Sequence, residues 1–138
     1  MKKVLILCTG NSCRSQMAEG FLKYFSPNIQ VYSAGTQPEP VNPFAVEVMA
    51  NIGIDIADFK SNKADEYTDI DFDFVITVCD NANEICPIYP QAKQLIHHSF
   101  IDPADAKGTK EEQLLVYIQV RDKIKDYIKN FTENNLNK

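Results

Sequence analysis

The residues of this chain best suited to chemistry are a cysteine and an arginine six positions apart. They belong to the octapeptide Cys-Thr-Gly-Asn-Ser-Cys-Arg-Ser, which spans residues 8–15. A thiolate is a strong nucleophile, and a helix N-terminus or a nearby guanidinium lowers the pKa of a cysteine. Arg14 carries a planar guanidinium that matches two oxygens of a tetrahedral oxyanion. The pattern predicts nucleophilic attack by Cys8 on a bound oxyanion.

The segments on either side of this octapeptide would position it as an anion site. An apolar run at residues 4–7 predicts a buried strand, and residues 16–22 predict a helix. Backbone amides converge in such a strand–loop–helix turn, and the helix dipole favours negative charge. Gly10 and Asn11 readily adopt the positive φ that a loop folded around an anion requires. Ser15 can hydrogen-bond the thiolate. The residues expected to hold the anion are Thr9, Gly10, Asn11, Ser12, Cys13 and Arg14.

The composition is that of an ordinary globular protein and excludes several classes of partner. The chain has 138 residues, 44% of them hydrophobic and 24% charged, which fits one domain. A formal net charge of −5 argues against nucleic acid or an anionic membrane as a partner. The apolar run near the N-terminus is too short for a signal peptide, and no run approaches the length of a membrane span. We therefore expect a cytoplasmic protein, and a monomer.

The four cysteines are spaced as Cys8-x4-Cys13 and Cys79-x6-Cys86. In an intracellular chain, cysteines indicate redox chemistry or metal binding more often than structural bridges. Zinc sites usually place two to four residues between paired ligands, so the second pair is too wide. Neither of the two adjacent histidines has a partner at metal-site spacing. The cysteines therefore favour redox chemistry, and we expect no metal site built from them.

The hydrophobic pattern predicts alternating strands and helices. Strands are expected at residues 3–8, 29–33, 72–78 and 94–98, and helices at 16–25, 43–52 and 109–131. Asn42 before Pro43 is a typical helix start, and Thr109 with Glu112 forms a capping box. This alternation predicts an α/β fold, a four-stranded parallel sheet with helices on both faces. We expect one catalytic domain over residues 1–131, and a frayed tail at residues 132–138.

Three reactive residues are predicted to converge at one edge of that sheet. Ligands of parallel α/β sheets bind beyond the carboxyl ends of the strands. Cys8 and Cys79 each end a predicted strand, and Asp102 follows the last one. Asp102 precedes Pro103, and Asp-Pro is also a common turn sequence, so its role depends on the loop at residues 8–15.

Residues 8–15 resemble the phosphate-binding loop of the low-molecular-weight protein tyrosine phosphatase superfamily, whose signature is Cys-x5-Arg-Ser. The longer stretch at residues 8–20 is similar to one branch, the thioredoxin-coupled arsenate reductases. The resemblance implies a phosphatase-like fold with the phosphate-binding loop after the first strand. It also implies that Cys8 is the nucleophile and that Asp102, in an Asp-Pro pair, is the general acid.

Two departures from the phosphatases favour the reductase branch. Tyrosine phosphatases of this superfamily typically carry an aromatic residue directly after Asp-Pro, and this chain has Ala104 there. The pattern Val-Cys-x6-Cys-Pro, which contains Cys79 and Cys86, matches the thioredoxin-coupled reductases. A hydrolase ends its covalent adduct with water and does not need this pair.

The resemblance implies a thiol relay that reduces arsenate to arsenite for arsenic detoxification. Cys8 would attack arsenate held by the loop, and Asp102 would protonate the departing oxygen. Cys79 would then attack Cys8 and release arsenite, leaving a transient Cys8–Cys79 disulfide. Attack by Cys86 would give the final Cys79–Cys86 disulfide, which thioredoxin would reduce. Glutaredoxin with glutathione is the less favoured reductant, because the reductases that use it carry differently spaced cysteines.

Other interpretations remain open. The chain could be a low-molecular-weight phosphatase for phosphotyrosine or small phosphate esters, with Cys79 and Cys86 as redox protection. Weak phosphatase activity is expected from the same loop in either case. It could also be a non-catalytic oxyanion- or arsenite-binding protein that uses three thiols. Cys8 alone would fit a small buried residue that ends a strand. Cys13 is interpreted as structural, with an off-pathway disulfide to Cys8 on oxidation.

No cofactor is expected, although some superfamily members bind potassium beside the loop. Asn11, Glu19 and Ser33 match positions of that site. A further position, where those members carry aspartate, aligns near Asn62. The loss of one carboxylate weakens the case for a hard cation, so the sequence does not establish a potassium site.

Overall fold

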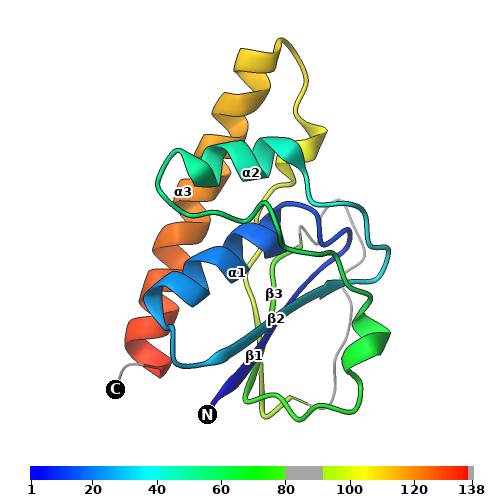
Figure 1. The fold of residues 1–138 in the computed structure, drawn as a ribbon, viewed down its shortest axis with the longest axis vertical. Coiled ribbons are helices and arrows are strands. Elements are labelled where there is room, and N and C mark those ends of the chain that lie inside the picture. Colours follow the sequence, from blue (N-terminus) through cyan, green and yellow to red (C-terminus); the bar gives the residue numbers. More distant parts are fainter. Residues whose placement is uncertain (80–91, 137–138) are drawn as a thin grey trace.

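A parallel sheet forms the centre of the computed structural model, which describes residues 1–79 and 92–136 (Figure 1). Its strands are β1 (Lys3–Cys8), β2 (Gln30–Gly35), β3 (Phe74–Thr77) and β4 (Gln94–His97). The helices are α1 (Arg14–Phe25), α2 (Pro43–Ala50), α3 (Lys110–Asn135), and the short 3₁₀ helices η1 (Ala64–Tyr67) and η2 (Pro103–Asp105). The strand order is β2-β1-β3-β4, and each neighbouring pair is parallel. This confirms the predicted four-stranded parallel sheet.

β1 is the central strand of the fold and leads directly into the loop at residues 8–15. It pairs with β2 on one side and with β3 on the other, so that Leu7 lies beside both Ala34 and Thr77. Residues 4–7 have no exposed surface, as expected for a uniformly apolar strand covered on both faces.

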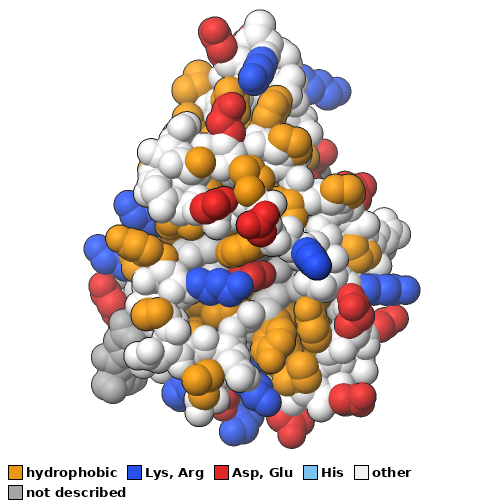
Figure 2. All heavy atoms as spheres, in the orientation of Figure 1, with side chains coloured by type: hydrophobic (Ala, Val, Ile, Leu, Met, Phe, Trp, Pro, Cys, Tyr) orange, Lys and Arg blue, Asp and Glu red, His pale blue; other side chains and the backbone are white. Residues whose placement is uncertain are grey.

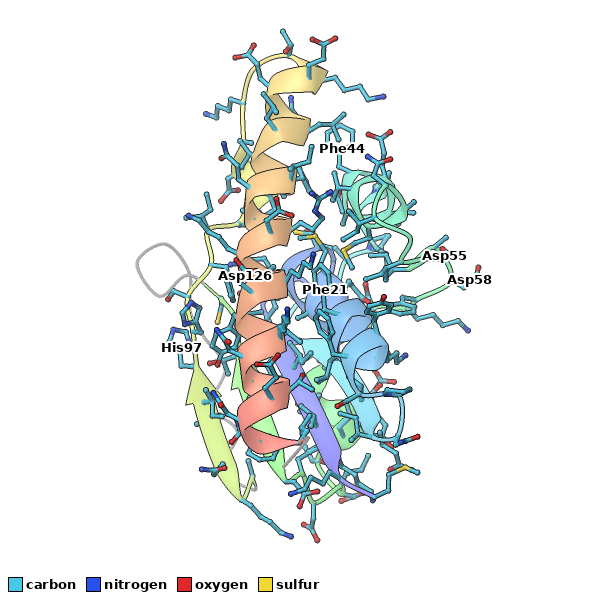
Figure 3. The ribbon with its side chains drawn as sticks, turned by 90° about the vertical axis from the view of Figure 1, so that its left-hand side faces the viewer. Phe21, Phe44, Asp55, Asp58, His97 and Asp126 are labelled. Carbon is cyan, nitrogen blue, oxygen red and sulfur yellow. The ribbon has the colours of Figure 1, made fainter. Side chains whose placement is uncertain are left out.

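The alternating side chains of β1 divide the core into two layers. Val4, Ile6 and Cys8 belong to the cluster that includes the buried residues of α1, α2 and α3. Leu5 and Leu7 belong to a smaller cluster on the other face, which η1 and its neighbouring segment cover. Figure 3 shows α3 in front of the sheet with α1 beside it. The reactive cysteine of β1 therefore lies on the face that carries the long helices.

The helix starts confirm the signals read from the sequence. The Asn42 side chain accepts a hydrogen bond from the Phe44 amide (2.8 Å) at the start of α2. Thr109 and Glu112 form the predicted capping box at the start of α3. Gly53 follows α2 with a φ of +84°, a conformation that glycine adopts without strain.

The ends of several elements differ from the prediction, and those of β2 and α3 show why. β2 continues to Gly35 rather than ending at Ser33, because residues 34 and 35 pair with the end of β1. α3 continues to Asn135, whereas the sequence predicted its end near residue 131 and a frayed tail from residue 132. Thr132 is buried there, and its hydroxyl donates to the Ile128 carbonyl (2.8 Å). The prediction missed this because it relied on the polar composition of residues 132–138.

The surface agrees with the charge balance of the sequence. On the face shown in Figure 2, acidic and basic side chains are interspersed, and no continuous basic area gathers over α1 and α2. Within the ranges 1–79 and 92–136, no helix is both long and apolar enough to cross a membrane.

Candidate active site

The loop between β1 and α1 is held in shape from within by Asn11. Asn11 is fully buried and has a φ of +48°, the positive value predicted for this position. Its side-chain nitrogen donates to Ser15 Oγ (2.8 Å), and its side-chain oxygen accepts from the Asn62 amide (2.8 Å). Its carbonyl accepts from Gln16 Nε2 (2.8 Å) and from Ser61 Oγ (2.7 Å). These four contacts fix a backbone conformation that costs free energy for a residue other than glycine.

The segment after β2 binds the loop from outside. The amides of Gln37, Glu39 and Asn42 donate to the carbonyls of Thr9, Gly10 and Ser12, at 2.9, 2.8 and 2.8 Å. A carbonyl oxygen aimed at an anion would repel it, so these bonds remove three unfavourable dipoles from the anion site.

Gly35 permits β2 to approach the loop closely. A Cβ atom built on Gly35 would lie 2.4 Å from the Thr9 carbonyl oxygen and 3.0 Å from the Asn11 nitrogen. Both neighbours are backbone atoms of the loop, so no flexible side chain can move aside.

Arg14 connects the loop to the segment after β4. The residue is 1% exposed. One of its terminal nitrogens donates to the Phe100 carbonyl (3.1 Å), and the other lies 3.5 Å from Asp102 Oδ2. Because the guanidinium is buried and oriented by these partners, it presents a fixed positive charge at the loop.

Asp102 is held at the edge of the site by three donors. Its Oδ1 accepts from the Ala104 amide (3.0 Å) as the cap of η2 and from Cys13 Sγ (3.4 Å), and Arg14 lies at its other oxygen. Its side chain is 25% exposed, so solvent reaches it. The structure thus brings the proposed general acid to the loop.

Cys13 contacts the proposed acid, which the sequence did not predict. Burial raises the pKa of the Cys13 thiol, and the negative charges of Asp102 and Cys8 raise it further, against a smaller opposing effect of Arg14. Cys13 therefore remains a thiol at neutral pH and can donate to Asp102. Burial of Tyr117 raises the pKa of its phenol, and the negative charge of Asp102 raises it further.

These groups open into a pocket of about 300 Å³. Its lining contains the predicted residues Cys8, Thr9, Gly10, Ser12, Cys13, Arg14, Asp102 and Ala104, together with Gln37, Glu39 and Asp105. The last three were missed because nothing in their local sequence marks them, and only the folded chain brings them to the loop. Two more carboxylates therefore line the pocket, and the wall after Asp-Pro is a methyl group rather than an aromatic ring.

The cysteines of the chain differ in whether they form a disulfide. Cys8 and Cys13 are thiols outside any disulfide. Cys79 is fully buried and disulfide-bonded. The amide of Val78 donates to the Leu7 carbonyl (3.0 Å). The next residue of each segment, Cys79 and Cys8, therefore lies at the same edge of the sheet. Cys86, its expected partner, lies outside the described residues.

Other candidate residues lie around the pocket rather than in it. The Ser15 hydroxyl accepts from Asn11, and its own proton is not used in that bond. His97 lies at the tip of β4 and contacts Thr77 Oγ1 (2.6 Å) and Ser99 Oγ (3.0 Å) (Figure 3). His98 stacks on Tyr127. Neither histidine lines the pocket.

The residues matched to a potassium site form a connected group beside the loop. Ser33 Oγ donates to Glu19 Oε1 (2.5 Å). The side-chain nitrogen of Asn62 donates to the Ser33 carbonyl (3.4 Å). The backbone amide of Asn62 donates to the side-chain oxygen of Asn11 (2.8 Å).

Comparison with known proteins agrees with this geometry. Residues 3–138 match the family described as low molecular weight phosphotyrosine protein phosphatase. The arsenate reductases of Halalkalibacterium halodurans and Shouchella clausii are 47% and 48% identical over 133 residues, which is 96% of each chain. A solved structure of an arsenate reductase in its oxidized state superposes with a TM-score of 0.81 at 32% identity, covering 97% of this chain and 98% of that one.

The match extends over the strand, the loop and the helices that position the pocket. The chain therefore belongs to the low molecular weight phosphotyrosine protein phosphatase family, together with the bacterial arsenate reductases that it resembles over almost its whole length.

Proposed function

We propose that this protein reduces arsenate to arsenite by a thiol relay. The observation that carries the proposal is the pairing of two cysteines in different oxidation states at one edge of the sheet. Cys8 is a thiol outside any disulfide, in a pocket with Arg14 and Asp102, and Cys79 is disulfide-bonded just after the neighbouring strand. A hydrolase with the same loop has no use for a second redox-active cysteine.

The first step is attack of the Cys8 thiolate on arsenic. A sulfur–arsenic bond forms, and a hydroxyl group of arsenate takes a proton from Asp102 and leaves as water. The buried guanidinium of Arg14 compensates the negative charge of the bound oxyanion. Bonds from residues 37–42 to the loop carbonyls keep those oxygens away from it.

The next two steps transfer the electrons. The Cys79 thiolate attacks Cys8 Sγ, a disulfide forms, and arsenic keeps the electron pair of the broken bond and leaves as arsenite. The Cys86 thiolate then attacks Cys79, which releases the Cys8 thiolate and leaves a Cys79–Cys86 disulfide. A Cys8 thiol together with a disulfide-bonded Cys79 is what the relay would leave after this step, and this supports the proposal.

The pocket favours a small inorganic oxyanion. Its volume is about 300 Å³, and Ala104 provides no aromatic surface to pack against a phenyl ring. Glu39 and Asp105, which also line the pocket, would repel the acidic side chains of a phosphopeptide. We propose weak hydrolysis of small phosphate esters as a side activity, because Cys8, Arg14 and Asp102 suffice for it.

We propose thioredoxin as the reductant and the cytoplasm as the compartment. A dithiol protein can reduce an intramolecular disulfide by exchange through a mixed disulfide, and the cytoplasm keeps such proteins reduced. The protein would act as a monomer, since Cys8, Arg14 and Asp102, the groups that the first step requires, all come from one chain.

The test is arsenate-dependent oxidation of NADPH with thioredoxin and thioredoxin reductase. We expect turnover by the wild type and none by Cys79→Ser or Cys86→Ser, while Cys8 in both variants still reacts once with arsenate.

Turnover only with glutathione and glutaredoxin would show that the reaction is right and the partner wrong. Hydrolysis of a phosphate ester at equal rates by all three proteins, without arsenate reduction, would show a phosphatase. Tight arsenite binding without turnover would show a binding protein.

A further inference from the structure

A buried carboxylate beside the loop is neutralised by the chain itself. Glu19 is on α1, one turn before Lys23, and its side chain is only 10% exposed. Its Oε2 lies 2.6 Å from the Lys23 ammonium, and its Oε1 accepts from Ser33 Oγ at 2.5 Å. A buried carboxylate must be paired or hydrogen-bonded to remain charged, and both of its oxygens have such partners here.

The other oxygens matched to a potassium site also have donors. The Asn11 carbonyl accepts from Gln16 and Ser61, and the Asn11 side-chain oxygen accepts from the Asn62 amide. The Ser33 carbonyl accepts from the Asn62 side chain. A diffusible cation needs several oxygens that it can coordinate at once, and it would have to displace these donors. The residues present therefore do not fit a potassium ion well.

The charge balance leads to the same conclusion. Glu19 is the single acid among the matched residues, and Lys23 already supplies one positive charge at hydrogen-bond distance. Asn62 stands where a second carboxylate would be needed to favour an additional cation. Its side-chain nitrogen is a donor to Ser33 and to the Lys60 carbonyl (3.1 Å), so this residue acts as part of the internal network.

We propose that the ammonium of Lys23 is the resident cation of this site, and that the anion-binding loop is held without a potassium ion. The network that would transmit its effect is continuous. Lys23 holds Glu19, Glu19 holds Ser33, Asn62 joins Ser33 to Asn11, and Asn11 fixes the loop at its positive-φ position. Lys23 is therefore a positioning residue for the loop, although it does not line the pocket.

The Lys23 side chain is suited to this role because its position is restrained. Its ammonium also lies 4.5 Å from the centre of the Phe59 ring, a cation–π contact. About half of the side chain is exposed, so the charge itself remains partly hydrated and is not costly to bury.

The test compares Lys23→Met with the wild type in potassium chloride, sodium chloride and choline chloride at equal ionic strength. Lys63→Met is the matched control, because Lys63 makes a looser, exposed pair with Asp65 (3.8 Å). The readouts are the thermal midpoint Tm and the Kd for inorganic phosphate. Neither depends on arsenate turnover, so the result is separate from the proposed reaction.

For the wild type and Lys63→Met we expect the same Tm and phosphate Kd in all three salts. For Lys23→Met in choline chloride we expect a Tm lower by about 3 °C and phosphate binding weaker by about fivefold. Potassium or sodium should restore part of both losses, because a small cation can then enter beside Glu19.

Three results would overturn the proposal. Stronger phosphate binding by the wild type in potassium chloride than in choline chloride would show that a diffusible cation holds the loop. A Lys23→Met protein that behaves like Lys63→Met would show that the ammonium is not needed. Losses in Lys23→Met that no small cation reduces would show that the site does not work as a cation site.

Discussion

At the scale of single residues, the site depends on charged groups whose orientation is fixed by backbone atoms. Arg14 is oriented by the Phe100 carbonyl, and Asp102 by the Ala104 amide. Neither contact requires a particular side chain at the partner position, so the sequence carries no direct sign of it. The residue type itself can be read from the sequence, because the ammonium of lysine lacks the planar fork that matches two oxygens of an oxyanion.

We predict that Arg14→Lys lowers kcat/KM for arsenate by about 100-fold or more, the usual loss when one fixed oxyanion donor is removed. The lysine ammonium would keep the charge but lose the fork that joins the loop to Phe100. Steady-state kinetics with the thioredoxin system measures this. Arg121→Lys is the control, since Arg121 is also buried but binds the Val48 carbonyl away from the pocket. Equal losses in both variants would contradict the prediction.

The individual site residues could be predicted to very different degrees. Cys8, Arg14 and Asp102 were found because a short motif or a strand end marks them, and the structure places all three around one pocket. The contact of Cys13 with Asp102 could not be predicted, because it joins residues 89 positions apart through side-chain directions. The same is true of Glu39 and Asp105, which reach the pocket only through the path of two loops.

At the scale of elements, the distance between β2 and the loop controls the shape of the anion site. Gly35 ends β2 against the Thr9 carbonyl, and the segment that follows it supplies the amides that bind the loop. Helix starts were predicted well because a cap is a local pattern, as at Asn42 and Thr109. Strand ends were predicted less well, because the end of β2 depends on pairing with β1 and not on its own residues.

We predict that Gly35→Ala weakens binding of inorganic phosphate by more than about tenfold, because the new methyl group would displace the Thr9 backbone. Isothermal titration calorimetry measures the Kd. Gly20→Ala is a suitable comparison, since its methyl group would meet only side-chain atoms of Ile56, Met49 and Ile54 at 3.0 to 3.3 Å. That variant should lose stability and keep its phosphate Kd. Unchanged phosphate binding by Gly35→Ala would refute the prediction.

At the scale of the whole molecule, one surface carboxylate ties the starts of the two central strands. Asp73 precedes β3 and accepts from the amide of Lys3 in β1 (2.9 Å) and from Lys93 Nζ (3.2 Å). The bond from the Lys3 amide lowers the pKa of Asp73 below its usual value, with a smaller contribution from Lys93 and against an opposing effect of burial. A lowered folded-state pKa means that the carboxylate stabilises the fold above the unfolded-state pKa of about 3.9.

We predict that Asp73→Asn lowers the free energy of unfolding by about 0.5 to 1 kcal/mol at pH 7, the usual worth of one hydrogen bond. The difference from the wild type should shrink as the pH falls below about 4, because the wild-type carboxyl becomes neutral as well. Urea unfolding at several pH values measures both. Asp65→Asn serves as control, because the Asp65 side chain is 81% exposed. A difference that stays constant from pH 7 to pH 3 would disprove this account.

The contacts of Arg14 and Cys13 also determine when the site forms during folding. Arg14 binds the carbonyl of a residue 86 positions later, and Cys13 binds one 89 positions later. Closing such long loops is slow compared with forming a helix, so the loop at residues 8–15 can adopt its final shape only after the last strand has docked. A nascent chain that has not yet exposed residue 102 outside the ribosome would therefore bind no oxyanion. Phosphate in the cell would then bind only the native state of newly made protein. It would stabilise that state relative to the folding intermediates that precede it.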